Sequence, residues 1–105
     1  MTLSAPADAA KADLSSVNRL TEAAATASAY TESCGRPLKA LWKARLRALY
    51  SNWLVPDSLL LQMTEFEDEF ARSTMTPSPC DEKMAAQWSD WAERDYDKVQ
   101  ALSLK

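Results

Sequence analysis

The sequence contains very little that favours β-structure or flexible turns. Its 105 residues include one glycine, three valines and no isoleucine. Alanine, leucine, glutamate, lysine, arginine and methionine are abundant instead, and these residues favour helices. Because a chain of this length can bury only one modest core, we expect a single all-α domain.

Histidine is absent, and so are Cys-x-x-Cys pairs, glycine-rich phosphate loops, nucleophile elbows and EF-hand patterns. A cysteine nucleophile would lack its usual imidazole partner, and a zinc site would have to use carboxylate ligands. Acid pairs such as Glu65 and Glu69 are most simply explained as a solvated helix face. We therefore predict no enzyme, no catalytic residue, no metal site and no cofactor.

Long apolar runs are missing as well. No segment approaches the roughly 20 apolar residues that a membrane-spanning helix requires, so we expect a soluble chain without a transmembrane segment. The formal net charge of −3 is small and acidic, whereas nucleic-acid-binding domains are usually basic. Nucleic acid is therefore not an expected partner.

Apolar residues recur at helical spacing in four stretches. We predict helices over about 10–33, 37–53, 57–74 and 79–102, arranged as an up-down bundle within a single domain over 10–105. Residues 1–9 are small, contain a proline and show no periodicity, so they are predicted to form a flexible tail. The expected core residues are Leu14, Val17, Leu20, Ala24, Ala27, Tyr30, Leu38, Leu41, Trp42, Leu46, Leu49, Leu59, Leu60, Met63, Phe66, Phe70, Met84 and Val99.

The helix ends carry recognisable signals. Gly35 fits the left-handed position that follows a helix, and Pro37 fits the first turn of the next helix. Pro56 is expected to end the second helix, with Asp57 or Ser58 capping the third. The fourth helix is expected to begin at Pro79, capped by Ser78.

The stretch from Cys34 to Cys80 is expected to organise the fold as a helical hairpin. Residues 36–47 carry five positive side chains and residues 57–69 carry five negative ones. Opposite charges on antiparallel neighbours would favour this pairing. Each exposed ion pair is worth only about 0–1 kcal/mol, so burial has to supply most of the stability.

Both cysteines lie at predicted helix ends, Cys34 at the end of the first and Cys80 at the start of the fourth. In an up-down bundle these ends share one pole, so a structural disulfide is the favoured interpretation. Two unlinked thiols, or a reactive or metal-binding pair, remain alternatives. A cysteine at a helix N-terminus can have a lowered thiol pKa.

Two groups of side chains are candidate contact surfaces. Four tryptophans are many for so small a core, and Trp is enriched at interfaces. Trp88, Trp91 and Tyr96 form the first candidate partner-binding patch, with Trp53 second, although core packing is the simpler role for each. The second group is a basic face of Arg36, Lys39, Lys43 and Arg47, whose simpler role is solvation. Asp95 interrupts the apolar stripe of the fourth helix.

The first residues lack the apolar core of a secretory signal. Met1 could be a native cytoplasmic start, or it could replace the leader of an exported protein. Cysteines placed at helix ends favour the exported alternative, which predicts a periplasmic or secreted protein; a cytoplasmic location is the alternative.

The chain resembles a family of small alpha-proteobacterial exported proteins of unknown function that contain two cysteines. The resemblance covers about residues 17–100. It rests on Arg19-Leu20 through Ala29-Tyr30, Cys34-Gly35, Trp42-x-x-Arg45-Leu46-x-Ala48-Leu49, Met63-x-x-Phe66-x-x-x-Phe70 and Pro79-Cys80. It implies a periplasmic helical domain with a Cys34–Cys80 bridge and supplies no activity. The acidic third segment departs from the family pattern.

These observations favour a non-enzymatic periplasmic interaction domain, a regulator or assembly factor that binds another protein. Self-association is a further option for the partner. The alternatives are a small stress or holdase chaperone, by analogy of layout, and an immunity-type inhibitor that opposes an exported toxin with its acidic third helix.

Overall fold

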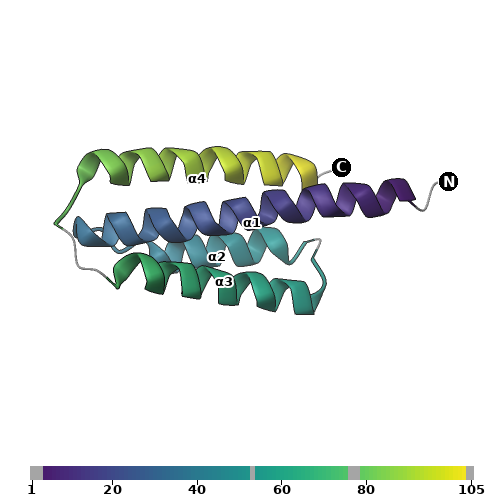
Figure 1. Cartoon of the computed structure of the whole chain (residues 1–105), viewed down its shortest axis with the longest axis horizontal. Coiled ribbons are helices and arrows are strands. Elements are labelled where there is room, and N and C mark those ends of the chain that lie inside the picture. The colour runs from purple at the N-terminus through teal and green to yellow at the C-terminus, as the bar shows by residue number, and fades with distance from the viewer. Residues whose placement is uncertain (1–3, 53, 76–78, 104–105) are drawn as a thin grey trace.

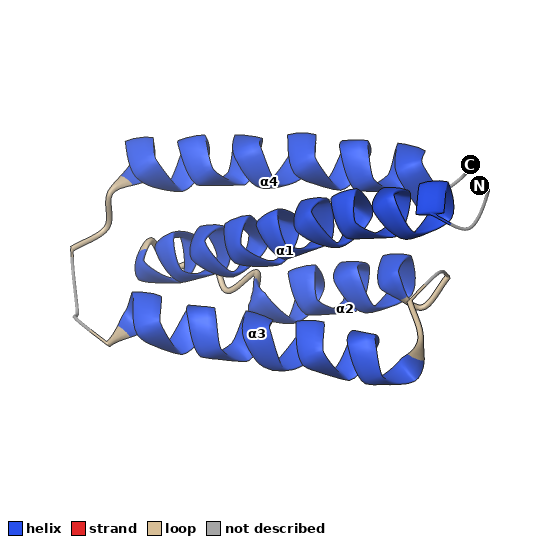
Figure 2. Ribbon diagram, turned by 45° about the vertical axis from the view of Figure 1, so that its right-hand side comes forward, coloured by secondary structure: helices blue, strands red, loops and turns tan. Residues whose placement is uncertain are grey.

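The computed structural model of the chain describes residues 4–52, 54–75 and 79–103. Four α-helices lie within them: α1 (Ser4–Ser33), α2 (Lys39–Tyr50), α3 (Pro56–Thr74) and α4 (Glu82–Ser103). The helices run alternately up and down, so α1 is parallel to α3 and antiparallel to α2 and α4 (Figure 1, Figure 2). The predicted all-α up-down bundle is confirmed.

Helix α1 is the centre of the bundle. It packs most extensively against α4 and α3, and less against α2. Its alanines explain this position, because Ala23, Ala24, Ala25, Ala27 and Ala29 are all buried and let neighbouring helices approach closely. The contacts between α2 and α3 are fewer, so the hairpin between the two cysteines does not organise the fold as predicted.

The C-terminus of α1 ends in a Schellman motif. The amide of Arg36 donates to the Thr31 carbonyl at 2.9 Å, and the amide of Gly35 donates to the Glu32 carbonyl at 3.0 Å. Gly35 has a φ of 82°, a conformation that a residue without Cβ adopts at little cost. The predicted role of Gly35 is confirmed.

Helix α1 begins earlier than the sequence pattern predicted. It starts at Ser4 rather than near residue 10, so residues 4–9, which were assigned to a tail, are helical. Pro6 falls in the first turn, where its missing N–H costs no hydrogen bond, and the neighbouring alanines favour helix. The first turns of α1 extend beyond the other three helices (Figure 1).

The remaining boundaries differ by a few residues. Helix α2 ends at Tyr50, before Pro56. Pro56 is the first residue of α3 and follows Val55, whose backbone is extended. Helix α4 starts at Glu82 instead of Pro79. Its cap is Asp81, whose carboxylate accepts the Met84 amide at 3.1 Å; Ser78, the expected cap, lies outside the described residues.

Most of the predicted core is buried, with three clear exceptions. Leu14, Leu41 and Leu60 are exposed. The buried apolar residues are Val17, Leu20, Ala23, Ala24, Ala25, Ala27, Ala29, Trp42, Leu46, Leu49, Tyr50, Met63, Phe66, Ala85, Ala92 and Val99. None of the described helices is both long and apolar enough to cross a membrane.

Candidate functional site

Two tryptophans lie about one turn apart on α4, at the surface of the bundle. The rings of Trp88 and Trp91 meet edge to face, with centroids 4.9 Å apart and an interplanar angle of 86°. Trp88 is half-buried against the core, whereas Trp91 is 40% exposed. An indole that is fixed by a neighbour yet open to solvent can contact a partner at little entropic cost.

The pair lines a groove of about 500 Å³ bounded by α1, α4 and one residue of α3. The buried Ala23 of α1 adds a small apolar surface between the tryptophans and the charged side chains. A hollow of this size is within the range of binding pockets, about 300–1,000 Å³. The lining consists of Arg19, Glu22, Ala23, Thr26, Glu69, Trp88, Trp91, Arg94, Asp95 and Lys98.

Charged side chains of both signs surround the tryptophans. Arg94 pairs with Asp90 at 3.0 Å, and Glu69 with Arg72 at 2.8 Å. The four remaining ionisable residues of the groove, Arg19, Glu22, Asp95 and Lys98, form no ion pair within the described part of the chain. The groove therefore offers two cations and two anions that a partner can use.

Sequence reasoning found only part of this groove. It identified Trp88, Trp91 and the interruption of the α4 stripe at Asp95. Residues Glu22 and Thr26 on α1 were missed, although they lie four residues apart on one helix face, a spacing that places them side by side. Glu22 and Thr26 lie next to the two tryptophans only because of the way α1 packs against α4. The sequence does not specify this packing.

Tyr96 does not join the two tryptophans. Its ring lies 6.3 Å from that of Trp42 on α2, on another face of α4. Arg45 stacks between these two rings, 4.2 Å from Trp42 and 4.3 Å from Tyr96, and donates two hydrogen bonds to Glu93. These contacts join α2 to α4 and assign Tyr96 a packing role. Trp53 lies outside the described residues.

The predicted basic face is half neutralised within the chain, because only two glutamates balance its four cations. Lys39 and Lys43 both bind Glu67 of α3, and their hydrogen bonds hold the pKa of that carboxyl below its ordinary value. Arg36 forms a two-point ion pair with Glu82 at 2.7 and 3.0 Å. Arg47 alone of the four forms no ion pair with the described residues. The face therefore links helices, and two of its four positive charges remain uncompensated.

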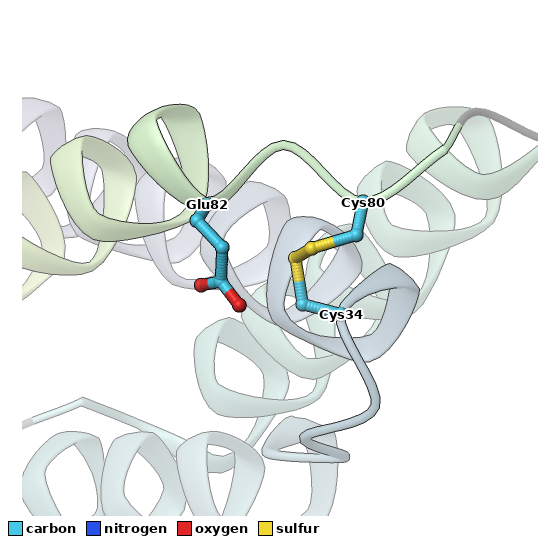
Figure 3. Close-up of side chains that lie close together, drawn as sticks. All are labelled: Cys34, Cys80 and Glu82. Carbon is cyan, nitrogen blue, oxygen red and sulfur yellow. A yellow bond between two sulfur atoms is a disulfide. The ribbon is translucent and has the colours of Figure 1, made fainter.

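The two cysteines form the disulfide that the sequence favoured. Cys34 and Cys80 are joined with their Cα atoms 4.6 Å apart, beside the carboxylate of Glu82 (Figure 3). The three side chains are close enough to hold a metal ion in principle. In this disulfide form, however, the sulfur atoms are bonded to each other and offer no thiolate. Cys80 is exposed, so the bond is accessible to thiol exchange.

A buried polar cluster joins three helices and was missed by the sequence analysis. Thr21 Oγ1 of α1 lies 2.7 Å from both Tyr50 Oη of α2 and Gln62 Oε1 of α3. The Tyr50 hydroxyl also donates to the Val17 carbonyl at 3.1 Å. Burial raises the pKa of Tyr50 far above its ordinary value, so the hydroxyl remains protonated. These partners satisfy the cluster, which makes it structural.

Comparisons with protein-family models, with curated proteins and with solved structures found no match to this chain.

Proposed function

We propose that the protein is a non-enzymatic interaction domain, a regulator or assembly factor, and that the groove beside Trp88 and Trp91 binds another protein. The observation that carries the proposal is Trp91. Its indole is fixed edge to face against Trp88, yet 40% of the residue is exposed, in a groove where four of the six charged side chains form no ion pair with the described residues. Interface hot spots have this composition, with an aromatic anchor inside a polar rim.

Replacement of Trp91 by alanine tests the proposal. Benzophenone placed at Thr26 in the groove would crosslink a bound partner in the native cell. We expect Trp91→Ala to reduce the crosslinked product at least tenfold, since truncation of an aromatic hot spot costs roughly 2 kcal/mol or more.

The matched control is Leu41→Ala. Leu41 is also large, apolar and exposed, but it lies on α2 and does not line the groove. Its replacement should leave the crosslinked product unchanged. Equal capture by wild type and Trp91→Ala would reject the groove as the binding surface.

We further propose that the protein works in an oxidising compartment, the periplasm or the exterior of the cell. The support is the Cys34–Cys80 disulfide, since such bonds persist mainly outside the cytoplasm. Mass spectrometry on protein taken from its native cell, alkylated before and after reduction, measures the state of the cysteines. Two alkylated thiols before reduction would contradict this location.

A further inference from the structure

We propose that the occupant of the groove is an amphipathic helix of a partner protein, lying along α1 between α3 and α4 and carrying basic side chains on one edge and acidic ones on the other. This inference rests on the proposed protein-binding function and specifies its ligand.

The groove is longer than the tryptophan site alone. A second hollow, lined by Asn18, Glu22, Leu61, Gln62 and Glu65, shares Glu22 with the first. A third, lined by Thr26, Ala29, Tyr30, Ser33, Ser73 and Pro79, shares Thr26 with it. The three therefore follow α1 from residue 18 to residue 33, a distance of about 22 Å, or roughly four helical turns.

The surroundings of the groove favour a helix over an extended peptide. An extended peptide usually binds by pairing with the free edge of a sheet. The described residues contain four helices and no strand, so no such edge is available among them. A helix satisfies its backbone hydrogen bonds internally, so it can bind along α1 without such an edge.

The charges define the two edges of that helix. On the α3 side, Glu65 forms no ion pair with the described residues, whereas Glu69 already pairs with Arg72. Glu22 of α1 lines the first and second hollows and adds a second unpaired acid. On the opposite side, Lys98 of α4 and Arg19 of α1 are cations that form no ion pair with the described residues, beside one unpaired acid, Asp95. Arg94 also lines this side but already pairs with Asp90 at 3.0 Å. A helix with lysine or arginine facing α3 and glutamate or aspartate facing Arg19 and Lys98 would complement both sides.

The central stripe of the helix would be apolar. It would contact Trp88 and Trp91 on one side and Leu61, which is 58% exposed, toward the end near Asn18. Ala23 and Ala29 have only methyl side chains, which lets a helix approach α1. The arrangement is the helix-in-groove mode of recognition, with apolar anchors at i, i+3, i+4 and i+7.

Three tryptophan-free peptides of 18 residues would test this inference. All share one leucine–alanine stripe; the first has lysine on one edge and glutamate on the other, the second only lysine and the third only glutamate. We expect calorimetric titration to show the mixed peptide binding about five- to tenfold more tightly than either uniform one. Equal affinity of all three, or no binding, would overturn the inference.

Charge reversal on the α3 side provides a matched pair of variants. Glu65→Lys removes an acid that lines the groove, whereas Asp68→Lys makes the same charge change on the same helix outside it. The first should weaken the mixed peptide about fivefold and the second should not. Equal effects of the two variants would contradict the predicted edge. Titration of Trp91→Ala should show weakened binding of every peptide that occupies the groove.

Failure of this inference can be separated from failure of the proposed function. If the benzophenone at Thr26 captures a Trp91-dependent partner through a segment without an amphipathic helical pattern, the function stands and the helix is excluded. If sedimentation shows a dimer that Trp91→Ala dissociates, a second copy is the occupant and this inference is wrong. A capture that does not depend on Trp91 rejects the proposed function itself.

Discussion

At the scale of single residues, the least expected feature is a polar cluster inside an otherwise apolar core. Thr21, Tyr50 and Gln62 come from three helices and are all buried. The Gln62 amide also donates to Asn18 Oδ1 at 2.5 Å. Hydrogen bonds are directional, whereas apolar contacts are not. The cluster therefore fixes the rotation of α2 and α3 about α1 more strictly than burial alone would.

Tyr50→Phe should destabilise the protein by about 1–2 kcal/mol, because it removes the hydroxyl that Thr21 and the Val17 carbonyl contact while the ring remains packed. Urea unfolding at pH 7 measures this difference. The matched control is Tyr30→Phe, since Tyr30 is only half-buried, and we expect it to change stability by less than about 0.5 kcal/mol. Equal midpoints for Tyr50→Phe and wild type would show that the cluster contributes nothing net.

The sequence contained a signal for this cluster. Gln62 lies three residues after Leu59 and four before Phe66, on the stripe that was expected to be buried. Thr21 lies likewise four residues after Val17. A polar residue on a buried stripe must find a partner, but its identity depends on the packing of separate helices. Periodicity therefore locates such residues without revealing what they bind.

At the scale of helices, pattern and charge predicted the elements well and their mutual packing less well. The four helices follow from apolar spacing, and Gly35 ends α1 as expected. The pairing of α2 with α3 through opposite charge is present, although one glutamate, Glu67, accepts both lysines. The alanines of α1 explain why this helix lies at the centre of the bundle, because small side chains let neighbouring helices approach closely. The apolar stripes of larger side chains did not indicate which helix would be central.

The ion pairs of Glu67 predict how stability depends on pH. Lys39 and Lys43 lower the pKa of this carboxyl in the folded protein, so their stabilisation is complete above the ordinary glutamate pKa of about 4.3. It is lost as the pH falls through the lower pKa of the folded state, where Glu67 becomes protonated. The group is partly exposed, so the gain is at most about 1 kcal/mol.

Comparing Glu67→Gln with wild type isolates this contribution. The variant should be less stable at pH 7 by up to about 1 kcal/mol, and the difference should disappear in acid, once Glu67 of the wild type is protonated. Glu65→Gln is the control, since Glu65 lies on the same helix and forms no ion pair with the described residues. A difference between Glu67→Gln and wild type that persists unchanged at low pH would contradict the ion-pair explanation.

At the scale of the whole molecule, the disulfide and the groove share the same helices. Cys34 closes α1 and Cys80 precedes α4, so the bond anchors the start of α4 to the end of α1 (Figure 3). Ser33 and Pro79, the residues beside the two cysteines, line the end of the groove. The bond therefore fixes one end of the surface that we propose as the binding site. We expect its loss to lower the free energy of unfolding.

Replacing both cysteines by alanine should lower the free energy of unfolding by roughly 4 kcal/mol or less, since the bond joins residues 46 positions apart in the unfolded chain. Neither cysteine belongs to the buried core, so helical circular dichroism should be retained under native conditions. Urea unfolding with and without a reductant is the measurement. A reductant should shift the urea midpoint of the wild type close to that of the variant and leave the variant's midpoint unchanged, because only the wild type has a disulfide to break. An oxidised wild type that unfolds at the same urea concentration as the variant would show that extensive packing between α1 and α4 already fixes this end of the bundle.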